Sequence, residues 1–74
     1  MTRHDQAQAI LNWANERFPQ LDIHEAMQAL RPPDPPVPTD PELITLLTEL
    51  RDGATTRSRR IQILRLIFLI FRDG

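Results

Sequence analysis

The sequence predicts an all-α fold, a small four-helix domain in which two helical hairpins are joined by a proline-rich extended linker. Apolar residues recur at intervals of three and four along four segments, which is the period of an amphipathic helix. Six of the seven prolines fall between residues 32 and 41, where they separate the first two segments from the last two. The 74 residues suffice for one domain, residues 1–74, and not for two.

The first half of the chain predicts a pair of helices, at residues 2–18 and 22–31. Thr2 and Asp5 are spaced as a capping box, and Pro19 ends the first helix. Asp22 is expected to cap the second helix, which is too short to be stable alone and should dock on the first as an αα-hairpin. The expected apolar stripes are Ala7, Ile10, Leu11, Ala14 and Phe18, then Ile23, Ala26, Met27 and Leu30.

Residues 32–39 form the expected linker, because consecutive prolines fix φ and leave only an extended polyproline II path open. At about 3.1 Å per residue, such a segment can cross one face of a small helical domain. It is interpreted as a stiff connector. The alternative is a ligand for an aromatic-lined groove, in which case Pro33, Pro36 and Val37 would face a partner.

The second half predicts helices at residues 40–52 and 55–72. Thr39 or Asp40 caps the first of these, and Gly53 is placed to end it with a left-handed residue. In the last helix, nine of the eleven residues from Ile61 to Phe71 are apolar. A strand is the alternative for this run, since isoleucine and phenylalanine favour sheets, but no other segment would pair with it.

The apolar content of the last helix is the main indication of function. Three short helices expose narrow apolar stripes, so a helix that is apolar almost all round carries more surface than they readily cover. Either it is the central core helix, or its surplus binds a second chain. The second interpretation makes Leu64, Ile67, Phe68 and Phe71 protein-binding residues, and Trp13 either flanks the core or anchors the same interface.

Charge is distributed unevenly along the chain. Residues 1–50 hold eight acidic residues against three arginines, whereas residues 51–74 hold six arginines against two acidic residues. Arg57, Arg59 and Arg60, at the start of the last helix, are expected to guide a partner electrostatically. The alternative is a DNA-binding regulator using these arginines, although Glu49 stands where a helix-turn-helix needs a small residue.

Composition argues against catalysis. The chain has no cysteine or tyrosine, one serine and two separated histidines, so no nucleophile triad and no zinc ligand set is expected. Its two glycines exclude a glycine-rich phosphate loop. The sequence therefore predicts no enzyme, no catalytic residue, no cofactor, no metal and no small-molecule substrate.

The sequence predicts a small non-catalytic regulator, adaptor or inhibitor that binds another protein chain and associates with itself as a homodimer. No leader is recognised, and the apolar run is too short for the roughly 20 residues of a transmembrane helix, so a cytoplasmic protein is expected. Small cysteine-free proteins of this kind occur among bacterial and phage regulators, which is the origin expected here.

Overall fold

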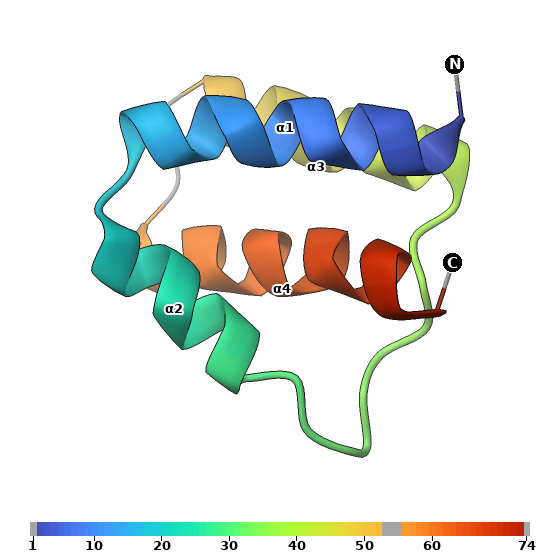
Figure 1. Ribbon diagram of the computed structural model, residues 1–74. Coiled ribbons are helices and arrows are strands. Elements are labelled where there is room, and N and C mark those ends of the chain that lie inside the picture. The colour runs from blue at the N-terminus through green and yellow to red at the C-terminus, as the bar shows by residue number, and fades with distance from the viewer. Residues whose placement is uncertain (1, 53–55, 74) are drawn as a thin grey trace.

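The computed structural model describes residues 2–52 and 56–73, which form four helices and no strand (Figure 1). The all-α prediction is confirmed, and the last segment is helical along its apolar run. The expected Gly53 cap and Thr55, the first residue expected in the last helix, lie outside the described residues. The helices are α1 Arg3–Arg17, α2 Gln20–Gln28, α3 Asp40–Arg51 and α4 Arg57–Asp73.

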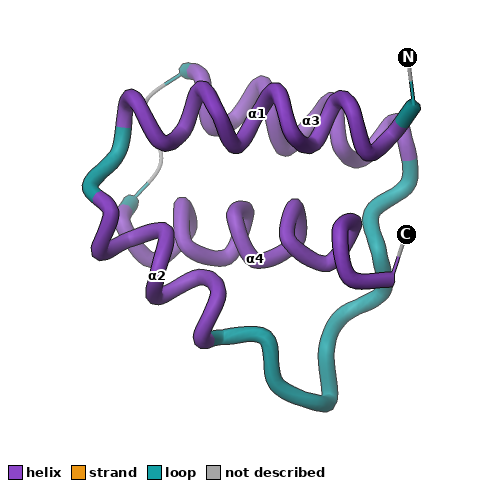
Figure 2. Tube along the Cα trace, viewed as in Figure 1, coloured by secondary structure: helices purple, strands orange, loops and turns teal. Residues whose placement is uncertain are grey.

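The other three described helices are arranged around α4. In Figures 1 and 2, α1 and α3 lie side by side and run in the same direction, while α4 runs the opposite way beneath them. An ion pair between Arg3 and Asp40 (3.0 Å) joins the starts of α1 and α3. The docking partner expected for the second helix is corrected, because α2 packs mainly on α4 and not on α1. A central apolar helix offers it a larger surface than the narrow stripe of α1.

The core of the molecule is built on α4. Its five innermost aliphatic side chains are 0% exposed, and all but Leu69 belong to one core cluster with the stripes of α1, α2 and α3. Their burial contributes roughly 10 kcal/mol before the entropy cost of folding. Residues 61–71 are thus the central core helix of this chain. The five side chains are Ile63, Leu64, Ile67, Leu69 and Ile70.

The helix ends follow the sequence signals in two helices. The backbone N–H of Asp5 donates to Thr2 Oγ1 (3.1 Å), and the N–H of Thr2 donates to the Asp5 carboxylate (3.2 Å), which completes the expected capping box. At α3, the N–H of Glu42 donates to Thr39 Oγ1 (3.4 Å). Both caps pair backbone donors that a helix start leaves without an intrahelical acceptor.

Helix α2 departs from its prediction. It begins at Gln20, two residues before the expected cap, and Asp22 makes no capping contact. The N–H of Asp22 donates to the carbonyl of Pro19 (3.0 Å), while its carboxylate turns to arginines of α4. The helix ends at Gln28, ahead of the prolines, and Met27 is 52% exposed and so lies outside the buried stripe in which it was expected.

The linker between α2 and α3 lies against α4. Pro33 and Pro36 are exposed, Pro38 is buried and Val37 packs against the core; the Pro32–Pro33 peptide bond is cis. The Asp34 side chain is 8% exposed.

Two arginines of α4 hold this carboxylate, Arg65 at 2.8 Å and Arg72 at 2.7 Å. The hydrogen bond from Arg65 is the largest influence on the pKa of Asp34. It outweighs the opposing effect of burial and holds this pKa below its ordinary value. The linker is therefore fastened to the core helix through Asp34.

Candidate protein-binding surface

The apolar residues of the last helix that were expected to bind a partner face the interior of the chain. Leu64 and Ile67 are 0% exposed. Phe68 and Phe71 are partly buried and pack against the core, and the Phe71 ring lies 5.7 Å from that of His4 on α1. A partner docking on the folded chain would reach only the outer parts of the two phenylalanines.

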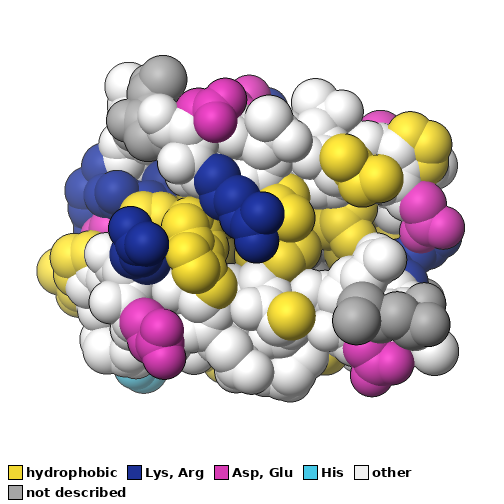
Figure 3. All heavy atoms as spheres, turned by 90° about the horizontal axis from the view of Figure 1, so that it is seen from above, with side chains coloured by type: hydrophobic (Ala, Val, Ile, Leu, Met, Phe, Trp, Pro, Cys, Tyr) yellow, Lys and Arg dark blue, Asp and Glu magenta, His cyan; other side chains and the backbone are white. Residues whose placement is uncertain are grey.

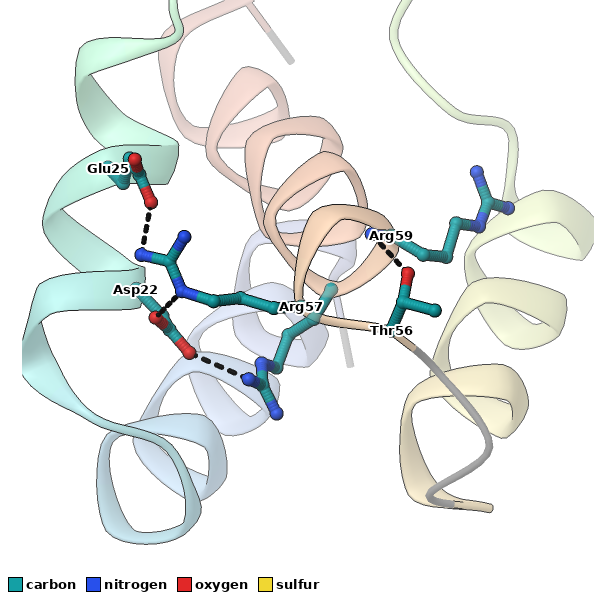
Figure 4. Close-up of polar contacts among 6 residues, drawn as sticks. Asp22, Glu25, Thr56, Arg57 and Arg59 are labelled. Carbon is teal, nitrogen blue, oxygen red and sulfur yellow. Dashed lines mark hydrogen bonds and ion pairs between the residues drawn. The ribbon is translucent and has the colours of Figure 1, made fainter.

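The arginines at the start of α4 hold this helix to its neighbours. Figure 4 shows Arg57 reaching across to Asp22 and Glu25 on α2, and its Nε lies 2.8 Å from the Asp22 carboxylate. Arg60 pairs with the same buried carboxylate at 2.9 Å. Hydrogen bonding to Asp22 raises the pKa of Arg57.

Arg59 also pairs within the chain, with Glu49 on α3, and hydrogen bonding to Glu49 raises its pKa. Arg57, Arg59 and Arg60 therefore neutralise three acidic residues of the same molecule. Much of their charge is therefore already compensated within the chain, which reduces the net gain for any phosphate group or acidic partner that binds them.

A different apolar surface is open to solvent, along the seam between α1 and α3 (Figure 3). We call it the α1–α3 groove. It has a volume of about 230 Å³, and its lining is mostly apolar. Ile44, on the rim, is 64% exposed although it is aliphatic. The lining residues are Gln6, Ala9, Ile10, Trp13, Leu43, Ile44, Leu47 and Arg51.

Trp13 closes one end of this groove. It packs against the core on one side, with its ring edge-on to Phe18 at 5.5 Å, and lines the groove on the other. The guanidinium groups of Arg17 and Arg51 lie 5.7 and 6.0 Å from its ring centre, within cation–π range. Trp13 thus has both positions considered from the sequence, flanking the core and facing a potential partner.

Arg17 and Arg51 differ from the arginines of α4 in one respect. Neither forms an ion pair with any carboxylate in residues 2–52 or 56–72, whereas Arg57, Arg59, Arg60, Arg65 and Arg72 are all paired. The positive charge left for an incoming group on this side of the molecule therefore lies beside Trp13.

Sequence reasoning missed Ile44, Leu47, Arg17 and Arg51 as surface residues. A signal exists for the three on α3, because this helix carries Asp40, Ile44, Leu47 and Arg51 at i, i+4, i+7 and i+11, which places them on one face. This stripe is distinct from the buried one, Leu43, Leu46 and Leu50. The helix is therefore apolar on two faces, and the second is only partly covered, with Leu47 partly buried and Ile44 exposed.

Comparison with models of protein families, with curated proteins and with solved structures finds no match to this chain. None of the described helices combines the length and apolar character needed to cross a bilayer. Within the described residues, no three metal-ligating side chains come together. The geometry of the α1–α3 groove is thus the available guide to function.

Proposed function

We propose that this protein is a non-catalytic regulator, adaptor or inhibitor that binds another protein chain through the α1–α3 groove. The observation that carries the proposal is the apolar groove in which Ile44 is exposed and Leu47 partly buried. It ends at Trp13, beside Arg17 and Arg51, which form no ion pair with a described carboxylate. Tryptophan and arginine are the residues most enriched among those that dominate binding energy at protein interfaces.

The size and lining of the groove favour protein side chains over a small molecule. Its volume of about 230 Å³ lies below the roughly 300–1,000 Å³ of typical small-molecule sites. Apart from Gln6 and Arg51, its lining offers few polar groups with which to orient a ligand. Aliphatic side chains from a second chain would fill such a groove and remove Ile44 from water, which is the main gain on association.

The secondary structure of the groove also limits how a partner docks. Both walls are helices, whose internal N–H and C=O groups are already bonded along each helix, so an extended peptide has no free edge to pair with. Side chains must supply the contact. A partner helix laid along the seam, with its own apolar stripe facing Ile44 and Leu47, fits this requirement.

Site-specific photo-crosslinking in cells that express the chain tests the proposal. A photoreactive residue in place of Ile44 is expected to give crosslinked protein products, because this position lies on the groove. Leu21 is the matched control, an equally exposed aliphatic residue on α2 and away from the groove. Equal crosslinking from both positions, or none from Ile44, would contradict the proposal.

A further inference from the structure

We infer that the occupant of the α1–α3 groove is the same face of a second copy of this chain, packed antiparallel in a symmetric dimer. The inference rests on the proposed function and names the partner. It is argued from the order of residues along one face of α3, which makes that face complementary to itself.

One stripe of α3 reads acid, apolar, apolar, base, as Asp40, Ile44, Leu47 and Arg51, and all but the partly buried Leu47 are exposed. The midpoint between Ile44 and Leu47 is also the midpoint between Asp40 and Arg51. A two-fold axis through that point, perpendicular to the helix, therefore sets Ile44 of one copy against Leu47 of the other, and Asp40 against Arg51. This is the residue i to j, j to i pattern of an isologous interface.

The charges fix the orientation of the two copies. The Asp40 side chain remains 69% exposed while paired with Arg3, so it can accept a second arginine. Arg51 has no carboxylate partner among the described residues. Antiparallel packing joins these two groups at both ends of the interface, whereas parallel packing would set arginine against arginine and acid against acid.

The remaining features of the groove fit this arrangement. Helices α1 and α3 run parallel to one another (Figure 1). The second copy therefore lays two further helices against this pair, which makes a four-helix bundle at the interface. Each α4 stays on the outer side of this bundle, with its core intact. Trp13 and Arg17 then lie toward one end of the interface, where the second copy covers part of the indole.

Self-association of the full chain is measured first, by sedimentation velocity from micromolar to millimolar concentration. A concentration-dependent dimer is expected, accompanied by a blue shift of the emission of Trp13, the only tryptophan. Ile44→Asp should raise the dissociation constant at least about tenfold, since it places a charge at the centre of the interface. The control Leu21→Asp should leave it unchanged.

Two charge reversals then test the orientation. Arg51→Glu and Asp40→Arg are each expected to weaken the dimer about tenfold, because each sets like charges opposite one another at both ends. The double variant Arg51→Glu/Asp40→Arg should recover the affinity of the native chain, since every pair across the interface is again attractive. Circular dichroism confirms that each variant is folded.

Three outcomes overturn the inference: a monomer at every concentration, a dimer insensitive to Ile44→Asp, or a double variant that associates no better than its parents. The proposed function fails separately, in the crosslinking experiment. A monomer that still crosslinks to a different protein from Ile44 would refute the symmetric dimer and leave the α1–α3 groove as a binding surface.

Discussion

Helix α4 and the α1–α3 groove differ in the opposite sense from what their sequences suggest: the apolar helix is buried, and the groove is open to solvent. Helix α4 contains the most apolar run in the chain, yet its side chains Ile63, Leu64 and Ile67 are 0% exposed. Helix α3 looks ordinary by composition, yet it leaves Ile44 in solvent. In this chain the most apolar helix is the central one. The open apolar surface comes instead from the second apolar stripe of α3, which holds Ile44 and Leu47.

The arginines show the same contrast. Those of α4 are numerous and suggest a binding patch, but each of the five lies within an ion pair of the folded chain. Arg17 and Arg51 are isolated in the sequence, and the fold sets both against Trp13, where neither forms an ion pair with a described carboxylate. Charge density along a sequence therefore says less about binding than charge that the fold leaves unpaired.

The contrast between buried α4 and exposed Ile44 is tested most directly by a matched pair of isoleucine truncations. Ile67→Ala should lower the free energy of unfolding by about 2–5 kcal/mol, because it opens a cavity in a fully packed core. At a concentration where the chain is monomeric, Ile44→Ala should change it by less than about 0.5 kcal/mol, since the side chain is then mostly in water. Urea denaturation followed by circular dichroism measures both. Equal losses would mean that α4 is not the centre of the fold.

The ion pairs that hold α4 to α2 give the next largest effect. Asp22 is 2% exposed and holds both Arg57 and Arg60, so Asp22→Asn should cost about 1–3 kcal/mol of unfolding free energy by weakening two charge-assisted contacts. Asp52→Asn is the matched control at an exposed position, expected to be near neutral. If both variants unfold at the same urea concentration, Arg57 and Arg60 are not engaged as described.

A substitution at Phe71 distinguishes a core role of α4 from a role in binding a second chain. Phe71→Ala should cost about 1 kcal/mol in unfolding free energy, since a partly buried ring loses its packing on α1. Under conditions where the variant is folded, its association in sedimentation velocity should match that of the native chain. If the variant kept native stability but associated more weakly, α4 would have to be part of the interface.

The attachment of the linker is expected to have the smallest effect, and it depends on pH. The pKa of Asp34 is lowered from 3.8 in the folded chain, mainly by the hydrogen bond from Arg65, so the ionised carboxylate favours folding. That contribution is fully present above the unfolded pKa and is lost as pH falls through the folded one.

The matching experiment compares urea midpoints of the native chain and Asp34→Asn. The native chain should have the higher midpoint at neutral pH, and the difference should shrink once the pH falls below about 4. A difference that stays constant down to acidic pH would show that Arg65 and Arg72 do not stabilise the ionised form.

Local signals along the chain predicted the local structure well. The capping pair Thr2 and Asp5, the stop at Pro19 and the cap at Thr39 depend on neighbours within a few residues, and each helix that relied on them was placed to within one residue. Helix α2 was placed less well, because its expected cap, Asp22, is drawn to arginines 35 and 38 positions away. The alternative use of that carboxylate cannot be read from the local sequence.

What the sequence determined by itself is the set of helices and the identity of the most apolar one, since both follow from periodicity and composition over short windows. Only the tertiary structure decided which apolar face stays open and which arginines stay unpaired. Both depend on the order in which helices pack around α4, and that order brings together residues such as Trp13 and Arg51 that are far apart in the chain. Burial and charge pairing are properties of these long-range contacts, so they appear only once the chain has folded.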